Sequence, residues 1–381
     1  MKAVVVGAGV AGLGCALSLR AAGIEATVLE QASELREVGA GLGLASNGVE
    51  VLDRLSIGDE VRVRSFVARR VVLRRRDGKA LSSVELAARR PMLGIHRADL
   101  QSVLADAVGR DAVRLGARVA AVGQSDNRAW VELETGDVEE ADVVIGADGI
   151  RSSVRAAAID PQRPVFAGYV GWRAVTHFSH PALAETFSET WGCGYRFGLV
   201  PIGGGRLYWF VSETGAEPVT ATLRRPKDEF LRIVVGWHDP IEAAVSVTAE
   251  DAIEGLGIYY LPPLAGWSSG RITLVGDAAH AITPDVSQGA ALALEDGFVL
   301  AAALRETRDT GAALRRYEDR RRKRAVAIAR LSRQVGRIAQ ANRPLLCRLR
   351  DTAFRLTPGF ISRRQFARVI EYELPALLKT P

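Results

Sequence analysis

The feature that most constrains the fold is a glycine-rich turn near the N-terminus, Gly7-Ala-Gly9-Val-Ala11-Gly12. It follows the apolar run Ala3–Val6, which is typical of a buried parallel strand, and it leads into a segment of helical character. Glycines at this spacing permit a tight turn, close approach of a pyrophosphate and close packing of a helix on a strand. With a second strand expected at 26–29, the first 30 residues predict a βαβ unit.

The residues after this second strand indicate which dinucleotide binds. Glu30, followed by Gln31, can accept hydrogen bonds from ribose hydroxyls, and its charge disfavours a 2′-phosphate. Unpaired N–H groups at the start of the first helix favour the phosphates. The sequence therefore predicts FAD or NAD at this turn, and not NADP.

Two later motifs place an aspartate beside a glycine at the end of an expected strand. Asp148-Gly149 follows the strand at 142–146, and Gly276-Asp277-Ala-Ala-His280 follows the strand at 271–275. Such an aspartate can bind ribityl or ribose hydroxyls, or it can simply form a turn. An NAD-dependent dehydrogenase needs no such second acidic site far along the chain, so the pair favours FAD.

The middle of the chain has a different character. From about 164 to 265 helical periodicity fades and aromatic-rich strands appear, and Asp77-Gly78 indicates a hairpin at 71–85. We expect an α/β fold: a Rossmann-like FAD/NAD(P)-binding domain with an inserted mixed β-sheet substrate domain and C-terminal helices. The expected ranges are 1–68, 92–163 and 266–310 for the FAD-binding domain, 69–91 and 164–265 for the substrate-binding domain, and 311–381 for the helical region.

Charge is concentrated late in the chain. The net charge is +6, but residues 305–350 hold 15 basic and 4 acidic residues, so the remainder is acidic. We interpret this stretch as a solvated basic helix face with an apolar stripe of Leu331, Val335 and Ile338. No nucleic-acid-binding motif supports a nucleic-acid partner, and no apolar run is long enough for a membrane span.

Cysteines and histidines indicate no metal or disulfide framework. Cys15, Cys193 and Cys347 are far apart with no C-x-x-C pair, and the five histidines lack metal-ligand spacing. His280 is interpreted as structural. The N-terminal residues lack the features of a signal peptide. We expect a cytoplasmic protein, monomeric or homodimeric, with neither a zinc site nor a disulfide.

In order and spacing, the three motifs resemble the class A FAD-dependent monooxygenases, the p-hydroxybenzoate hydroxylase-like aromatic hydroxylases, over nearly the whole chain. The resemblance implies a set of FAD contacts along the sequence. It assigns Glu30 and Arg36 to the adenosine end, Arg97 to the ribityl-phosphate side, Asp148 and Gly149 to the neighbourhood of the pyrophosphate, and Asp277 to the ribityl chain.

A fourth motif of the family is present in altered form. The family shows a proline, then Gly-Gln-Gly, then an asparagine two residues later, whereas this chain has Pro284-Asp285-Val-Ser287-Gln288-Gly289-Ala290-Ala291. Pro284, Gln288, Gly289 and Ala290 remain candidate FAD contacts. The helix that begins here would point its N-terminus at the flavin ring, and Ala291 removes the hydrogen bond of the usual asparagine amide.

The resemblance also implies the reaction. NAD(P)H binds transiently and reduces FAD, O2 forms a flavin C4a-hydroperoxide, and one oxygen atom passes to an aromatic or polycyclic small molecule. Hydroxylation, epoxidation and Baeyer–Villiger insertion stay open. The alternatives are a flavoprotein that binds a reactive intermediate without turnover, an NAD-dependent dehydrogenase, and a basic nucleic-acid binder.

The substrate site is expected on the strands of the insert. Arg196 could pair with a carboxylate, phenolate or enolate, and Tyr208 could accept or relay a phenolic proton, so both are candidate catalytic residues. Trp172 and Trp209 could line the same cavity. The alternative is that Arg196 is a surface arginine and the aromatic residues are core. Asp285 could contact substrate or cap the following helix.

Overall fold

The computed structural model describes residues 1–35, 40–88 and 90–377. Its first layer is a six-stranded sheet in the order β18–β19–β12–β1–β2–β8, and all neighbours except β18 and β19 are parallel. Parallel pairing places the carboxyl ends of β1, β12 and β19 along one edge. The strands are β1 (Lys2–Val6), β2 (Glu25–Leu29), β8 (Val113–Arg114), β12 (Val143–Gly146), β18 (Ser268–Ser269) and β19 (Ile272–Leu274).

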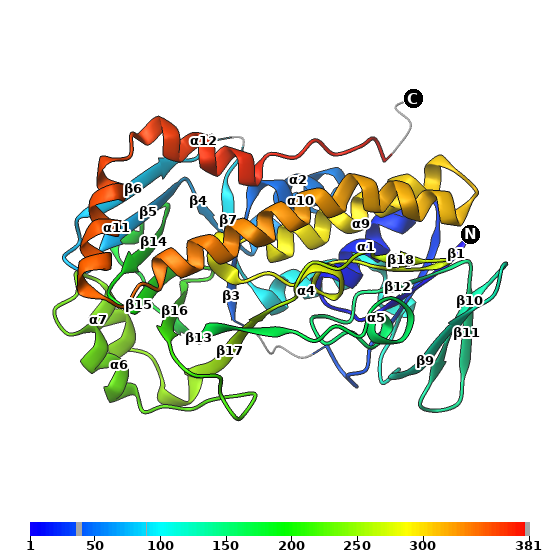
Figure 1. Cartoon of the computed structure of the whole chain (residues 1–381), viewed down its shortest axis with the longest axis horizontal. Coiled ribbons are helices and arrows are strands. Elements are labelled where there is room, and N and C mark those ends of the chain that lie inside the picture. The colour runs from blue at the N-terminus through cyan, green and yellow to red at the C-terminus, as the bar shows by residue number, and fades with distance from the viewer. Residues whose placement is uncertain (36–39, 89, 378–381) are drawn as a thin grey trace.

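Helices α1 (Val10–Ala21) and α9 (Gly289–Glu306) pack together in this part of the molecule (Figure 1). The contact is tight because a Cβ on Gly297 would lie 2.6 Å from Cys15 Cα. Further elements of this part include an antiparallel three-stranded sheet at one end of the molecule. They are α4 (Arg97–Val108), β9 (Val119–Gln124), β10 (Ala129–Leu133), β11 (Val138–Ala141), α5 (Ser153–Ala158) and α8 (Asp277–His280).

A seven-stranded sheet forms the other end of the molecule, in the order β17–β13–β16–β15–β14–β5–β6. One face packs on α6 (Lys227–Val234) and α7 (Ile241–Ser246) in a separate apolar core that contains Trp209 and Phe230. The strands are β5 (Arg70–Arg75), β6 (Ala80–Glu85), β13 (Val165–His177), β14 (Thr186–Trp191), β15 (Tyr195–Pro201), β16 (Arg206–Thr214) and β17 (Glu254–Tyr260).

A small antiparallel sheet, β3–β7–β4, lies between the two large sheets, and β3 and β7 meet β15. The face of the seven-stranded sheet that does not pack on α6 and α7 is therefore directed toward the edge where β1 and β12 end. The elements are β3 (Gly41–Leu44), α2 (Ser46–Arg54), α3 (Gly58–Val63), β4 (Phe66–Ala68) and β7 (Met92–His96).

The C-terminal helices run back across the molecule (Figure 1). Helix α10 (Thr310–Ala339) passes α9 and reaches the seven-stranded sheet, where α11 (Pro344–Leu356) and α12 (Gly359–Ile370) follow. Within the described residues, none of the helices combines the length and apolar character that crossing a bilayer requires.

Helix α10 corrects two expectations. Its buried face consists mainly of small residues, among them Ser332, Gly336 and Ala339, whereas Ile338 is exposed. The basic stretch is also not wholly solvated, because Arg321 is fully buried between two carboxylates. Small residues are needed here because a Cβ on Gly336 would lie 2.5 Å from the Asp285 carboxylate.

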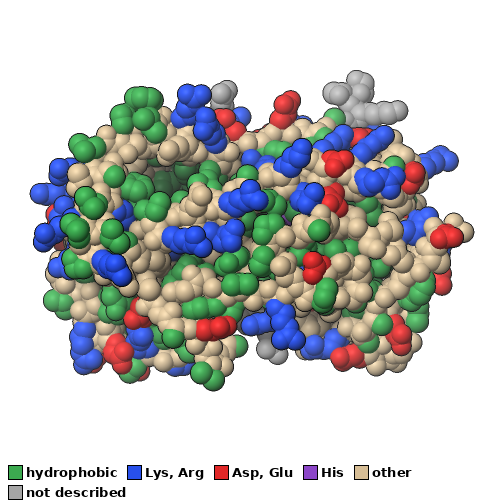
Figure 2. Space-filling model, in the orientation of Figure 1, with side chains coloured by type: hydrophobic (Ala, Val, Ile, Leu, Met, Phe, Trp, Pro, Cys, Tyr) green, Lys and Arg blue, Asp and Glu red, His purple; other side chains and the backbone are tan. Residues whose placement is uncertain are grey.

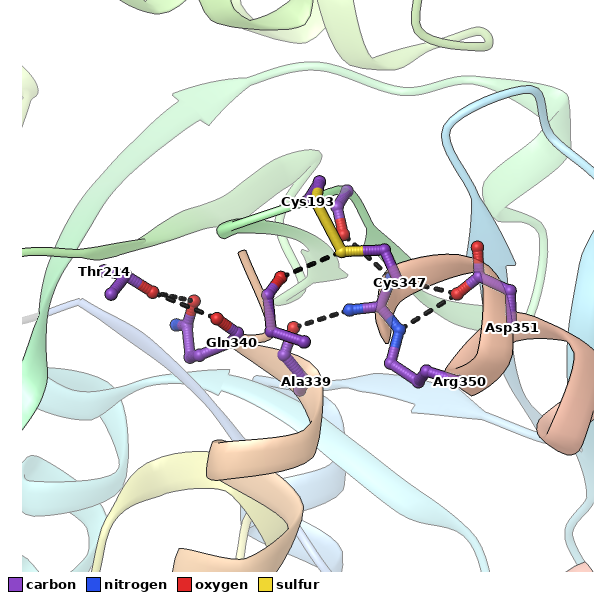
Figure 3. Close-up of a disulfide and its surroundings, with 9 residues drawn as sticks. Cys193, Thr214, Ala339, Gln340, Cys347, Arg350 and Asp351 are labelled. Atoms are coloured by element: carbon purple, nitrogen blue, oxygen red, sulfur yellow. Dashed lines mark hydrogen bonds and ion pairs between the residues drawn. A yellow bond between two sulfur atoms is a disulfide. The ribbon is translucent and has the colours of Figure 1, made fainter. Parts of the chain in front are cut away.

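The expected absence of a disulfide is also wrong. Cys193, in the turn between β14 and β15, is bonded to Cys347 of α11 (Figure 3). The two cysteines are 154 residues apart in sequence, and only the return of the C-terminal helices to the seven-stranded sheet brings them together. Arg350 strengthens the junction by donating to the carbonyls of Gly192 and Ala339 at 2.8 and 2.9 Å.

Candidate FAD and substrate site

The glycine turn has the close packing that its spacing predicts. Gly7 has a φ of +104°, and a Cβ there would lie 2.7 Å from the carbonyl of Ala147. A Cβ on Gly12 would lie 1.8 Å from the Gly7 carbonyl, whereas a Cβ on Gly9 would meet open space. No side chain caps the start of α1. The N–H groups of the first turn, next to Ala11, therefore face an open region suited to a phosphate.

Glu30 stabilises this turn from the end of β2. Its two carboxylate oxygens accept hydrogen bonds from the backbone N–H of Ala8 at 2.7 Å and of Ala32 at 2.9 Å. Each oxygen keeps a second lone pair for a ribose hydroxyl. Gln31 beside it is exposed. Arg36 lies outside the described residues.

Asp148 lies beside the glycine turn, and its Cα would be 3.1 Å from a Cβ on Gly7. Its carboxylate accepts hydrogen bonds from the hydroxyls of Ser152 and Ser153 and from the backbone N–H of Ser153. These bonds stabilise the start of α5. Gly149, with a φ of +81°, faces open space. The motif thus brings a glycine to the edge of the site, while its aspartate holds the next helix.

Asp277 behaves differently. It is exposed to the open space of the site and has no hydrogen-bond partner within the described residues, although the surrounding protein raises the pKa of its carboxyl. Arg97, exposed at the first turn of α4, is close enough to lower that pKa in part. An unpartnered carboxylate at the end of β19 fits the hydroxyls of a ribityl chain.

The start of α9 completes this region. Gln288 precedes the helix and accepts a hydrogen bond from the Asn47 amide at 2.9 Å. No side chain caps the helix, and a Cβ on Gly289 would meet open space. Ser287 keeps a left-handed backbone, with a φ of +51°, at the position where the family has glycine. Pro284 opens the preceding turn, and Ala290 follows on the helix.

The packing of α9 on α2 explains why alanine occupies position 291, where the family has asparagine. It is buried against α2, where a Cβ on Gly48 would lie 3.1 Å from Ala291 Cβ. A larger residue at 291 would need space that this helix contact occupies.

A buried ionic network that the motifs did not reveal fixes α9. Asp296 accepts from His280 at 2.5 Å and from Arg321 at 2.8 Å, and Arg321 also pairs with Glu295 at 2.6 Å. Burial lowers the pKa of His280, but Asp296 outweighs this and raises it. The ion pair with Asp296 thus explains a structural role for His280. The sequence signal was the i, i+1 carboxylate pair inside an otherwise apolar helix.

These residues fit a flavin dinucleotide. Two uncapped helix N-termini, three glycines that face open space and one unpartnered aspartate meet near the edge where β1, β12 and β19 end. The helix starts suit the pyrophosphate and an electron-rich ring edge, and Asp277 suits the ribityl hydroxyls between them. The fold and this constellation define a dinucleotide-binding flavoprotein.

The face of the seven-stranded sheet that looks toward this region carries a charged cluster. Arg196 on β15 is almost fully buried, pairs with Asp285 at 2.6 Å and lies 3.3 Å from Glu189 of β14. The Tyr169 hydroxyl donates to Asp285 at 3.0 Å. Burial would lower the pKa of the Arg196 guanidinium, but the two carboxylates raise it above its usual range. Arg196 is therefore a permanent cation, and not a surface arginine.

Tyr208 lies on the same face as Arg196. In the register of β15 and β16, Arg196 pairs with Ser212 and Val200 with Tyr208, so the two side chains stand four positions apart, about 13 Å along the strands. Phe210 lies between them and covers Gly198. Burial raises the pKa of Tyr208 to about 12. Its hydroxyl is therefore protonated at neutral pH.

The structure separates Trp172 and Trp209 from this cluster, so the expectation that they line the same cavity is wrong. Trp209 is fully buried on the α6 side of the sheet and donates to Thr248 at 2.9 Å. Trp172 stacks edge-on against Phe230 in the same core. Adjacent residues of a strand point to opposite faces, so Tyr208 and Trp209 cannot share a cavity.

Comparison with known proteins assigns the family. The family model described as an FAD binding domain matches residues 1–332. Aurachin C monooxygenase/isomerase of Stigmatella aurantiaca is 34% identical over 93% of this chain and 94% of its own. 2-Heptyl-3-hydroxy-4(1H)-quinolone synthase of Pseudomonas aeruginosa is 33% identical over 97% of both chains. The crystal structure of Klebsiella pneumoniae HpxO complexed with FAD and uric acid superposes with a TM-score of 0.88 at 30% identity, covering 97% and 96%.

The chain belongs to the family of FAD-dependent aromatic monooxygenases that its motifs resemble. It is an enzyme with FAD as its cofactor. This assignment decides against the NAD-dependent dehydrogenase and favours a monooxygenase over a flavoprotein without turnover.

Proposed function

We propose that this enzyme uses NAD(P)H and O2 to hydroxylate a neutral bicyclic nitrogen heterocycle held on the Arg196 face of the seven-stranded sheet. The names of two relatives support the substrate class, since one makes a 4(1H)-quinolone and the other was crystallised with uric acid. Both molecules carry a ring N–H and a ring carbonyl group. A site that recognises them must offer donors and acceptors close together.

The charge balance of the Arg196 cluster carries this proposal. One guanidinium faces two carboxylates, so Arg196, Asp285 and Glu189 together carry a net negative charge. Asp285 is fully buried, whereas Glu189 is partly exposed and is the carboxylate that a ligand can reach. This net charge disfavours a carboxylate or phenolate beside Arg196. A neutral heterocycle could donate N–H to Glu189 and accept from Arg196.

The remaining residues of the face position the substrate. FAD, when bound, supplies the redox chemistry, namely hydride uptake from NAD(P)H and activation of O2. Tyr208, protonated at neutral pH, donates a hydrogen bond and does not act as a base. Phe187, Val200 and Phe210 share the face and exclude water from it. Trp191 donates to Glu189 at 2.7 Å and fixes its orientation.

The test is substrate-dependent oxidation of NADH or NADPH by the FAD-loaded enzyme. Quinolones and purines should accelerate the oxidation and gain one oxygen atom, as seen by mass spectrometry. Benzoates of similar size should not accelerate it. Replacing Glu189 by Gln should shift the preference toward the anionic compounds while FAD stays bound. Preference of the unmodified enzyme for benzoates would refute the substrate class.

The expected division of the chain is kept as part of this proposal. Residues 1–68, 92–163 and 266–310 would form the FAD-binding domain, 69–91 and 164–265 the substrate-binding domain, and 311–381 the helical region that joins them. A cytoplasmic location, where NAD(P)H is available, and a monomeric or homodimeric state complete it. Limited proteolysis and analytical ultracentrifugation test the domain ranges and the oligomeric state.

A further inference from the structure

Helix α11 exposes an apolar stripe to solvent. Leu345, Leu349 and Leu356 are 69%, 58% and 71% exposed, and their spacing of four and seven residues places them on one side of the helix. Cys347 and Arg350, on the opposite side, are buried against the sheet. The leucines therefore point away from the body of the protein. Phe360, at the start of α12, is 65% exposed and extends the apolar surface.

The same two helices carry an unbalanced positive charge. Between residues 343 and 370 the only acidic residue is Asp351, and it is engaged by Arg350. Figure 2 shows blue and green side chains gathered at the end of the molecule where α11 lies. Six exposed arginines there pair with no carboxylate within the described residues: Arg343, Arg348, Arg355, Arg363, Arg364 and Arg368.

The body of the protein holds α11 in this orientation. The disulfide Cys193–Cys347 ties the helix to the turn between β14 and β15 (Figure 3). Arg350 donates hydrogen bonds to the carbonyl of Gly192 in that turn and to the carbonyl of Ala339 at the end of α10. Phe354 packs on Trp191 with ring centroids 4.9 Å apart. Because the inner face of α11 is fully used, the helix cannot rotate to bury its leucines.

We propose that α11 and the start of α12 form a lipid-docking surface, made of Leu345, Leu349, Leu356, Phe360 and the six arginines, that binds a bilayer containing anionic phospholipids. Leucine and phenylalanine side chains would enter the boundary between headgroups and acyl chains, while the arginines contact lipid phosphates. Apolar side chains flanked by basic ones are the pattern that interfacial helices use.

The charge selects the lipid over a second copy of this chain. If two copies met through α11, the six arginines of each would face those of the other without acidic partners, and like charges directly opposed disfavour such an interface. An anionic bilayer offers the opposite charge over the whole surface. If the substrate is the neutral heterocycle proposed above, the apolar hollow beside α11 and α12 in Figure 2 would lie next to the membrane.

Co-sedimentation of the FAD-loaded, full-length enzyme with vesicles tests this directly. Vesicles of phosphatidylcholine with phosphatidylglycerol should bind the protein, and vesicles of phosphatidylcholine alone should bind it far less. Arg348→Glu with Arg355→Glu should lower the partition coefficient at least about tenfold. Leu345→Ser with Leu349→Ser should lower it to a similar extent.

Two exposed residues outside this surface provide matched controls. Val219 is 102% exposed, and Arg308 lies near Met1 at the other end of the molecule. Val219→Ser and Arg308→Glu should leave binding unchanged, and bound flavin, measured by absorbance, should be equal in all variants. The proposal is overturned if the protein binds both vesicle types equally or neither. It is also overturned if the surface variants bind like the controls, or if they change the oligomeric state in the absence of lipid, which would assign the face to a second copy.

Discussion

Replacing Arg196 by Met should destabilise the protein strongly, because it leaves a buried carboxylate without its cation. Arg196 and Asp285 lie 2.6 Å apart and are 2% and 0% exposed. At an effective dielectric constant of about 20, two charges about 4 Å apart attract by about 4 kcal/mol. Removing one partner of a buried pair costs about 3–5 kcal/mol. We expect the free energy of unfolding to fall by this amount.

The assay is urea unfolding followed by tryptophan fluorescence, with FAD at saturating concentration in every sample. Arg110→Met is the matched control, since Arg110 and Asp106 are also 2.6 Å apart but 65% and 43% exposed. That change should cost less than about 1 kcal/mol. Adding Asp285→Asn to Arg196→Met should recover at least about 2 kcal/mol, because the uncompensated charge is gone. If the double variant is no more stable than the single one, the reasoning from charge burial fails.

Three further predictions concern the FAD region. Asp277→Ala should weaken FAD binding about tenfold without loss of secondary structure, because a hydrogen bond to a charged group contributes about 1.5 kcal/mol or more; fluorescence titration with FAD measures this, and unchanged affinity would remove Asp277 from the site. Ser287→Gly should raise the free energy of unfolding by up to about 1 kcal/mol, since glycine adopts the left-handed backbone freely; a lower melting temperature would contradict it. The pKa of His280 is raised in the folded protein, so its ion pair with Asp296 stabilises fully below about pH 6.5 and is lost as the pH rises through the folded value; His280→Gln should flatten the pH profile of the melting temperature above pH 6.5, and an unaltered profile would argue against the ion pair.

The sequence predicted those parts of the site whose positions depend only on neighbouring residues in the chain. The glycine turn and Glu30 follow from one βαβ unit, and Asp277 follows from its place at a strand end. The face of each strand residue also follows from the twofold repeat, which already forbids Tyr208 and Trp209 on one side. Whether Tyr208 or Trp209 is the residue that points toward the site depends on the pairing of β15 with β16. No local pattern encodes that register.

Contacts between residues far apart in the chain could not be predicted from the sequence, for a different reason. Arg321 sits within a basic run, and nothing in its neighbours distinguishes it from the exposed arginines beside it. Its burial depends on Glu295 and Asp296, which α9 presents from another part of the chain. Cys193 and Cys347 meet for a similar reason. A charge or thiol becomes informative only when the element opposite it is known.

The covalent link from Cys193 to Cys347 has a consequence for damage to the chain. It closes a loop of 154 residues that includes the whole of β15, β16, β17, α9 and α10. A protease that cuts one exposed peptide bond within this loop yields two pieces that stay joined, and they separate only after the sulfur atoms are reduced. A nicked molecule would therefore migrate as an intact one on a gel without reductant, and it would keep α11 seated on the sheet.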